Sequence, residues 1–248
     1  MDKLPHIGLT VGSVSPDVLV CGDPGRATRI AAQLDDVELL GELREYRSYR
    51  GTFAGKPVTV CSHGIGAPGA AIAFEELIAA GARRIIRVGT CGGLQPDIRS
   101  GDLVVAQAAV QQMGYGRFAL PDGYPAVADL DVTMALRTTA EEDGRSTHTG
   151  IVLTSDVFYP GVAARRIDYA MMSQANVLAV EMECAALFGI GSLRGVQTGA
   201  ILAVDGNVLE DGEDMESFKP HREIVQTAVE TATVSALNAL RQLTSPNE

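Results

Sequence analysis

The strongest constraint on the fold of this chain is a regular alternation of short β-rich apolar runs with longer alanine-rich stretches. The stretch GAAIAFEELIAAGA at 69–82 predicts a helix that stops at Gly81. A second helix is expected to begin near Glu183, and the tail at 222–243 carries apolar residues at helical spacing. Alternating strands and helices are typical of an α/β fold, here as one domain over residues 1–248. The predicted strands are 17–22, 57–62, 84–90, 102–110, 149–156, 177–181 and 199–205.

Several of these strands end in glycine or a polar residue rather than in further apolar residues. In an open α/β sheet, ligands bind outside the carboxyl ends of the strands, so these endings are predicted to line one crevice. Polar residues also begin ordinary loops, so each ending alone is weak evidence. The endings are Gly22-Asp23, Ser62-His63-Gly64, Gly89-Thr90, Ser155-Asp156, Glu181 and Asp205.

Two of the endings have the composition of an anion site. GDPGR places Gly22 at a turn and Arg26 at the start of a helix, where backbone N–H groups and a guanidinium favour phosphate. RVGTCGG places Arg87 inside a buried run and Thr90 in a glycine-rich bend. A buried Arg87 needs an anionic partner, either a carboxylate such as Glu183 or a bound anion. Because no GKS or GKT follows, inorganic phosphate or a sugar phosphate fits better than a nucleoside triphosphate.

Three other patterns are less specific. GIGAPG at 64–69 matches the dinucleotide motif, but the next predicted strand ends in Gly89-Thr90 without the expected acidic residue, so NAD is disfavoured. VEMEC brings Glu181 and Glu183 to a strand–helix junction, where they suit a sugar diol or simply a solvated helix start. Asp205 is either a turn residue or a carboxyl group that moves a proton.

Composition excludes several classes of function. The net charge is −11, from 20 basic and 31 acidic residues, which disfavours nucleic acid as a partner. The chain has no long apolar run and no leader-like start, so we expect a cytoplasmic protein without a membrane span. The four cysteines and four histidines show no metal-ligand spacing, so no metal is expected.

Taken together, these segments resemble the nucleoside phosphorylase family of uridine phosphorylases and hexameric purine nucleoside phosphorylases. The resemblance covers roughly residues 5 to 210, and the motifs SHGIG, GTCGG and VDG look most like the protozoan-parasite branch of the purine enzymes. The matching segments, in family order, are HIGLT, GDPGR, REYRSYRG, SHGIGAPGAAIAFEEL, RVGTCGGLQPDI, YPAVADLD, TSDVFYP, VEMECAALF and AVDG.

The resemblance implies a central mixed, twisted β-sheet that is partly barrel-like and flanked by helices. It implies attack of orthophosphate on C1′ of a nucleoside, without a cofactor, in a homo-oligomer that is a hexamer built as a trimer of dimers. The implied catalytic residues are Asp205 and Arg87. The implied phosphate ligands are Gly22, Arg26, Arg44, Arg87 and Thr90, with Arg44 donated by a neighbouring subunit. The implied ribose contacts are His6 (also from the neighbour), Glu181, Met182 and Glu183, and the implied base contacts are Cys91, Gly92, Phe158 and Asp205.

The identity of the base rests on two segments. In the uridine branch a Gln and an Arg after FYPG bind the pyrimidine, whereas here Val162 and Ala164 stand there and Arg165 and Arg166 follow. An aspartate at the position of Asp205 implies the purine branch, in which it donates a proton to N7. The arginine that assists this aspartate in some bacterial enzymes has no evident counterpart in NVLEDGEDMESFK at 207–219. We therefore expect a purine nucleoside phosphorylase, with a uridine phosphorylase of atypical base contacts as the alternative.

Overall fold

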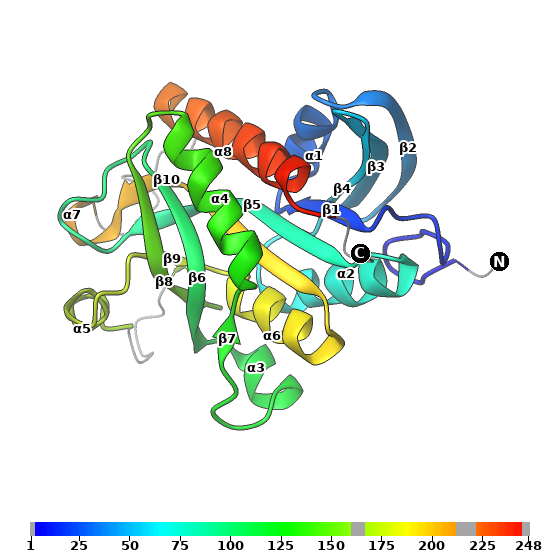
Figure 1. The fold of residues 1–248 in the computed structure, drawn as a ribbon. Helices are drawn as coiled ribbons and strands as arrows, with labels where there is room; N and C mark the ends of the chain where they lie inside the picture. Colours follow the sequence, from blue (N-terminus) through cyan, green and yellow to red (C-terminus); the bar gives the residue numbers. More distant parts are fainter. Residues whose placement is uncertain (1–2, 160–166, 212–221, 245–248) are drawn as a thin grey trace.

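The computed structural model describes residues 3–159, 167–211 and 222–244, and its strands form one mixed sheet of ten strands (Figure 1). The strands are β1 (Asp17–Cys21), β2 (Asp35–Leu43), β3 (Tyr46–Phe53), β4 (Lys56–Ser62), β5 (Arg84–Gly93), β6 (Leu103–Gln112), β7 (Ala126–Val127), β8 (Thr147–Ser155), β9 (Ala179–Glu181) and β10 (Gln197–Asn207). The helices are α1 (Pro24–Ala31), α2 (Ala67–Ala80), α3 (Gly114–Ala119), α4 (Leu130–Glu142), α5 (Tyr169–Gln174), α6 (Cys184–Arg194), α7 (Val208–Asp211) and α8 (Glu223–Gln242).

The sheet closes partly into a barrel because β5 pairs with three other strands. It is parallel to β1 and to β10, and its last residues pair antiparallel with β9. A closed ring is therefore formed by strands β5, β10, β6, β8 and β9. The sheet continues from β5 as an open extension made of β1, β4, β3 and β2. This arrangement confirms the expected partly barrel-like mixed sheet.

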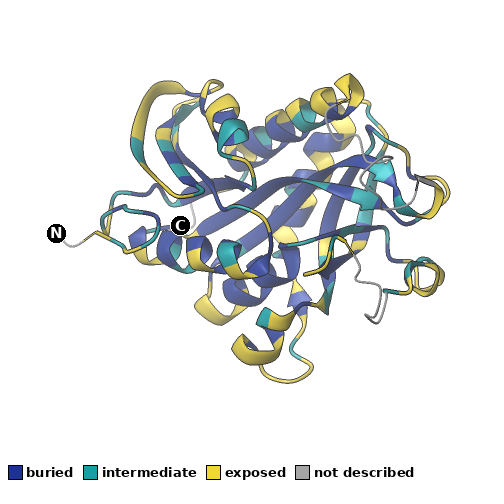
Figure 2. Ribbon diagram, turned by 180° about the vertical axis from the view of Figure 1, so that it is seen from behind, coloured by how far each residue is buried: buried dark blue, intermediate teal, exposed yellow. Residues whose placement is uncertain are grey.

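Alternation along the strands divides the interior into two apolar layers. On β10, Leu202 and Val204 pack into the layer covered by α2 and α6, whereas Ile201 and Ala203 pack into the layer covered by α1, α4 and α8. A strand that is apolar on both faces must lie between two helical layers. Figure 2 shows these strands as buried ribbon between helices whose outer surfaces are exposed.

The seven predicted strands and four predicted helices, including the one expected at Arg26, all form, with end points shifted by a few residues. Helix α2 ends at Gly81, whose φ of 127° favours a residue without Cβ. The predictions missed the β2–β3 hairpin, α4 and the short elements β7, α3, α5 and α7. No residue of β2 is buried, so its sequence lacks the apolar alternation that identifies a half-buried strand.

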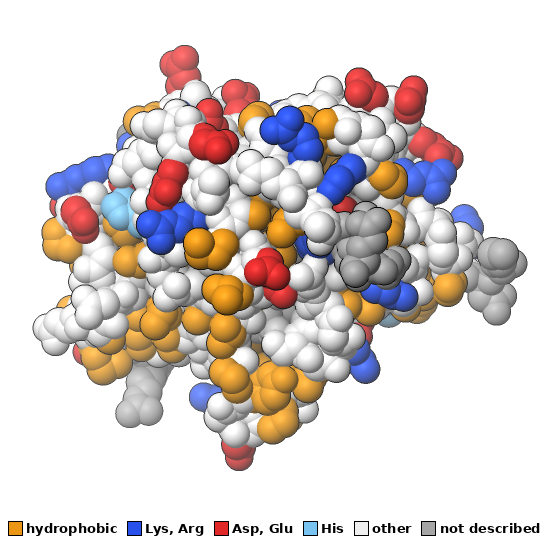
Figure 3. Space-filling model, viewed as in Figure 1, with side chains coloured by type: hydrophobic (Ala, Val, Ile, Leu, Met, Phe, Trp, Pro, Cys, Tyr) orange, Lys and Arg blue, Asp and Glu red, His pale blue; other side chains and the backbone are white. Residues whose placement is uncertain are grey.

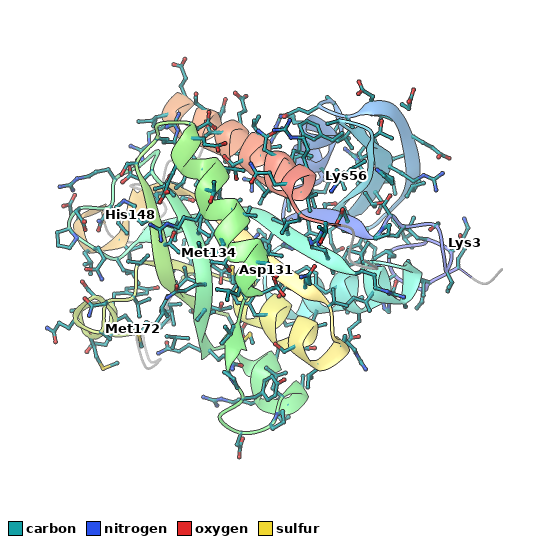
Figure 4. All side chains as sticks on the ribbon, viewed as in Figure 1. Lys3, Lys56, Asp131, Met134, His148 and Met172 are labelled. Carbon is teal, nitrogen blue, oxygen red and sulfur yellow. The ribbon has the colours of Figure 1, made fainter. Side chains whose placement is uncertain are left out.

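The amino ends of the central strands are joined by a buried ion pair. Arg84 Nη1 donates to Asp17 Oδ1 at 2.7 Å, and Nε and Nη2 donate to Gln197 Oε1 at 3.0 and 2.8 Å. Nη2 also donates to the backbone oxygen of Thr244 at 2.8 Å, which attaches the chain after α8. Lys56, labelled in Figure 4, donates to backbone oxygens at the end of α8. Burial raises the pKa of Asp17, and the Arg84 guanidinium opposes this rise.

We predict that Arg84→Met lowers the free energy of unfolding by about 3–5 kcal/mol, because it leaves the Asp17 carboxylate buried without its cation. The neighbouring Arg83 is exposed, so Arg83→Met is the matched control and should change stability by less than about 0.5 kcal/mol. Urea unfolding at a fixed protein concentration measures both. Equal losses in the two variants would show that the ion pair does not hold the strand ends together.

Candidate functional site

The carboxyl ends of the central strands surround one cavity of about 760 Å³. Each strand ending that carries a glycine or polar residue in the sequence contributes to its wall, which confirms the predicted crevice. A cavity of this size is within the usual range for small-molecule sites. The residues from those endings that line it are Gly22, Asp23, Gly64, Thr90, Ser155, Glu181 and Asp205.

The ends of β1 and β4 meet through two glycines. Gly64 has a φ of 76°, its N–H donates to the backbone oxygen of Gly22 at 3.0 Å, and a Cβ on Gly22 would lie 3.1 Å from the oxygen of Gly64. Asp23 caps α1 and accepts from the backbone N–H groups of Gly25 at 2.9 Å and Arg26 at 2.8 Å. These two N–H groups are therefore not free for an anion, contrary to the sequence interpretation. The side chain of Arg26 remains available.

Arg26 faces the cavity with unused hydrogen-bonding capacity. Its Nη1 approaches the backbone oxygen of Val88 at 3.5 Å, at the long end of the range for a hydrogen bond. Its buried Nε has no partner among the described residues. A buried donor without an acceptor is costly, so this guanidinium is suited to an anion in the cavity.

Arg87 is fixed by two carboxylates. Its Nη2 lies 2.5 Å from Glu183 Oε2 and 3.3 Å from Glu181 Oε2, and its Nε donates to Glu181 Oε2 at 3.3 Å. Burial alone lowers the pKa of Arg87, but the Glu183 and Glu181 carboxylates outweigh burial and raise it. The guanidinium lies against Gly89, where a Cβ would be 2.6 Å from Cζ. Of the two partners that the sequence left open for Arg87, a carboxylate or a bound anion, the carboxylate is present.

Both glutamates of VEMEC also organise the backbone. Glu181 accepts from the Thr154 hydroxyl at 2.5 Å and from the N–H groups of Glu183 and Cys184 at the start of α6. Glu183 Oε1 accepts from the N–H of Gly66 at 2.6 Å, in the glycine loop before α2. Burial raises the pKa of Glu183, and Arg87 opposes the rise. Met182 and Glu183 line the cavity; the ribose contacts assigned to them and to Glu181 stay predictions.

Asp205 lies at an irregularity in β10. Its neighbours Val204 and Gly206 pair with the consecutive residues Cys91 and Gly92 of β5, so Asp205 is an extra residue in the ladder. Such a bulge re-aims a side chain, and Asp205 lines the cavity although it is only 8% exposed. Burial raises its pKa from 3.8 to about 7, even though its own backbone, the Thr90 side chain and the Arg26 and Arg222 guanidiniums act to lower it.

Arg222 is a cavity residue that the sequence analysis missed. It lies at the N-cap of α8, and its Nη2 donates to the backbone oxygen of Asp205 at 2.7 Å and to Ser100 Oγ at 2.6 Å. Arg222 lies three residues beyond the segment 207–219, in which no assisting arginine was evident. The predicted start of the C-terminal helix at residue 222 was the available signal, because a side chain there can turn back over the strand ends.

The rest of the cavity is mainly apolar. Cys91, Gly92 and Phe158 line it, as the resemblance implied, and so do Val180 and Val208. A Cβ on Gly92 would lie 2.5 Å from Val208 Cγ2, so glycine is required for this close packing. The segment with Val162, Ala164, Arg165 and Arg166 lies outside the described residues.

His6 and Arg44 do not line this chain's cavity. His6 Nδ1 lies 2.7 Å from Glu76 Oε1, and its side chain is 43% exposed. Arg44 is exposed in the two-residue turn between β2 and β3, with a φ of 57°. Gly8 contacts Leu43, since a Cβ on it would lie 3.8 Å from Leu43 Cδ2. The two predicted residues therefore belong to neighbouring segments of the surface.

Comparisons with known proteins agree with this fold. Residues 16–241 match the Phosphorylase superfamily. The chain is 38% identical over 246 residues to guanosine phosphorylase of Halorubrum lacusprofundi, covering 98% of this chain and 100% of that protein. It is 40% identical over 235 residues to uridine phosphorylase of Treponema pallidum, covering 91% of each. Purine nucleoside phosphorylase of Toxoplasma gondii in complex with immucillin-H superposes with a TM-score of 0.89 at 37% identity, over 96% of this chain and 95% of that one.

These relatives carry purine and uridine names at similar identity, so they support nucleoside phosphorylase activity without distinguishing the base. No helix among the described residues is long and apolar enough to span a membrane. The match covers most of the chain, and the cavity lies at the strand ends that the family motifs predict. This chain belongs to the phosphorylase superfamily and is a nucleoside phosphorylase.

Proposed function

We propose that the chain cleaves purine ribonucleosides of the inosine and guanosine type with orthophosphate, giving the free base and ribose 1-phosphate. A phosphate oxygen forms the new bond to C1′ while the bond from C1′ to N9 of the purine breaks. Asp205 gives its proton to N7, so the base leaves as a neutral molecule. No cofactor takes part in this reaction. The observation that carries the proposal is a buried Asp205 in the cavity with a pKa near neutrality.

The phosphate is held at the β1 and β5 ends of the cavity. Arg26 supplies a donor without a partner among the described residues, and Gly22 leaves space for close approach. Arg87 and Thr90 complete this end. The Glu181 and Glu183 carboxylates partly neutralise Arg87 and hold its guanidinium in place before the anion arrives. Such preorganised charge is what stabilises a phosphate nucleophile beside an oxocarbenium-like sugar.

The ribose lies between the phosphate and the base. Glu183 accepts hydrogen bonds from the sugar diol while its other oxygen is held by Gly66, and Met182 packs against the sugar face. The base occupies the apolar region lined by Phe158, Val180 and Val208, with Cys91 and Gly92 at its wall. Asp205 is the acidic group facing that region, and Arg222 fixes the backbone on which it sits.

A second copy of the chain completes the site. Arg44 is exposed, the His6 side chain is 43% exposed, and neither lines its own cavity. Arg44 follows Leu43 at the end of β2, and Gly8, two residues after His6, lies beside Leu43. Exposed apolar side chains on β2, such as Leu39 at 53%, favour burial against another subunit. A second apolar surface, visible over α3 in Figure 3, includes Phe118 at 94% exposure. Two such surfaces support a hexamer built as a trimer of dimers. We propose that this assembly works in the cytoplasm.

The alternative is a uridine phosphorylase with atypical base contacts. The relative from Treponema pallidum, named uridine phosphorylase, favours it at 40% identity. A pyrimidine has no N7, so in this alternative Asp205 has no such nitrogen to protonate. It also requires pyrimidine contacts from residues 160–166, which lie outside the described residues.

We expect phosphate-dependent cleavage of inosine and guanosine with a kcat/KM at least about tenfold above that of uridine, because Asp205 stabilises only the purine leaving group. Chromatography that monitors the release of free base, with and without phosphate, measures these kcat/KM values and their dependence on phosphate. Faster turnover of uridine would establish the alternative, and equal base release without phosphate would indicate a hydrolase.

We predict that Asp205→Asn lowers kcat/KM for inosine about 10²–10⁴-fold, since an amide cannot act as a general acid. Cleavage of 4-nitrophenyl β-D-ribofuranoside, whose leaving group departs without protonation, should fall by less than about tenfold. Steady-state kinetics on both substrates test the role. An equal loss on both would mean that Asp205 shapes the cavity rather than donating a proton.

The pH dependence should follow the raised pKa of Asp205. The acid is protonated below about 7 and ionises above it, so the active form is present at low pH and is lost as pH rises. The ratio of kcat/KM for inosine to that for the nitrophenyl riboside should therefore fall about tenfold per pH unit above the pKa. Titration of phosphate affects both substrates and cancels in the ratio. A ratio that stays constant across this range, as expected for Asp205→Asn, would contradict the assignment.

A further inference from the structure

His63 is a buried, titratable side chain that the proposed reaction does not use. It follows β4 in the glycine loop and is completely buried. Its ring packs edge-to-face on Phe74 with centroids 5.4 Å apart, and a Cβ on Gly22 would lie 4.0 Å from its Cε1. His63 therefore lies next to two residues that line the cavity, Gly22 and Arg87.

The hydrogen bonds of His63 define one tautomer. Its Nδ1 lies 2.9 Å from the backbone oxygen of Gly64, which can only accept, so Nδ1 carries the proton. Nε2 then has a free lone pair, and it faces Arg87 Nη1 at 3.5 Å. Burial, with Arg87 and Arg26 nearby, lowers the pKa of His63 well below its ordinary value, so the ring stays neutral.

The contacts of Arg87 differ among its three nitrogens. Within the described part of the chain, carboxylates bond to Nε and Nη2, whereas Nη1 faces the imidazole of His63. Nη1 carries two hydrogens, so one can go to His63 while the other remains for a ligand. A guanidinium is planar, so an acceptor at Nη1 fixes the direction of that second N–H.

We propose that His63 is a positioning residue for Arg87: its neutral Nε2 accepts from Nη1 and so aligns the other N–H of Nη1 toward the phosphate. This inference rests on the proposed function, in which Arg87 binds phosphate. A carboxylate at position 63 would neutralise the guanidinium further, and a cationic side chain would repel it. A neutral acceptor orients Arg87 and leaves its remaining charge for the anion.

The test uses two variants, each of which retains one of the two hydrogen-bonding functions of the imidazole. In His63→Gln the amide oxygen can occupy the place of Nε2 and accept from Arg87. In His63→Asn the shorter amide can donate to Gly64 but does not reach Arg87. We expect His63→Asn to raise the KM for phosphate at least about tenfold, the loss of one hydrogen bond to a charged group. We expect the KM for the nucleoside to change by less than about threefold, and His63→Gln to restore the phosphate KM to within about threefold of the parent.

Equal phosphate KM values in the two variants, whether raised or unchanged, would overturn the proposal. Arg87→Ala separates this outcome from failure of the proposed function: if it leaves the phosphate KM unchanged, Arg87 does not bind phosphate at all. If Arg87→Ala raises the KM but His63→Asn does not, only the positioning role fails.

A measurement on the unmodified protein does not depend on how the variants fold. In ¹⁵N NMR of histidine-labelled protein, His63 should show a protonated Nδ1 and an unprotonated Nε2 at neutral pH, and the Nε2 signal should move on addition of inorganic phosphate. A signal from the Nε2–H tautomer, or one insensitive to phosphate, would contradict the proposal.

Discussion

The buried ion network of Arg87 with Glu181 and Glu183 is the interaction on which the rest of the site depends. Burying three charged groups costs several kcal/mol per ion unless every polar atom is well paired. Here Arg87 comes from β5, Glu181 ends β9 and Glu183 follows it, so the network crosses a junction in the barrel. The remaining carboxylate oxygen of Glu183 holds the glycine loop before α2 through Gly66. Removing one partner would therefore loosen several walls of the cavity together.

The carboxyl groups that line the cavity have different environments. Glu181 is surrounded by donors from Arg87, Thr154 and the start of α6. Asp205 is buried at a bulge, and the guanidinium of Arg222 bonds to its backbone oxygen. Burial without such close cation pairing favours the neutral acid. The same cavity thus combines two glutamates that hold a cation with a carboxyl group whose pKa is raised to about 7.

Much of the architecture could be predicted from the sequence, because strands buried on both faces and amphipathic helices leave strong patterns. The common crevice was predictable as well, since polar endings of parallel strands gather at one edge of the sheet. The prediction failed where the pattern was weak or nonlocal. Exposed β2 has no buried residue, Asp23 binds the N–H groups that seemed free for an anion, and Arg222 reaches the cavity from beyond a long segment.

The sequence by itself therefore determined the α/β layers, the family, and which residue types stand at the strand ends. These follow from local periodicity and from motifs of contiguous residues. Only the tertiary structure decided that Arg87 pairs with both glutamates and that Asp205 occupies a bulge. It also decided that the unprotonated Nε2 of His63 faces Arg87. Each of these depends on the register between strands far apart in the chain. A register shift of one residue would reverse the side on which such groups project, and no local pattern specifies it.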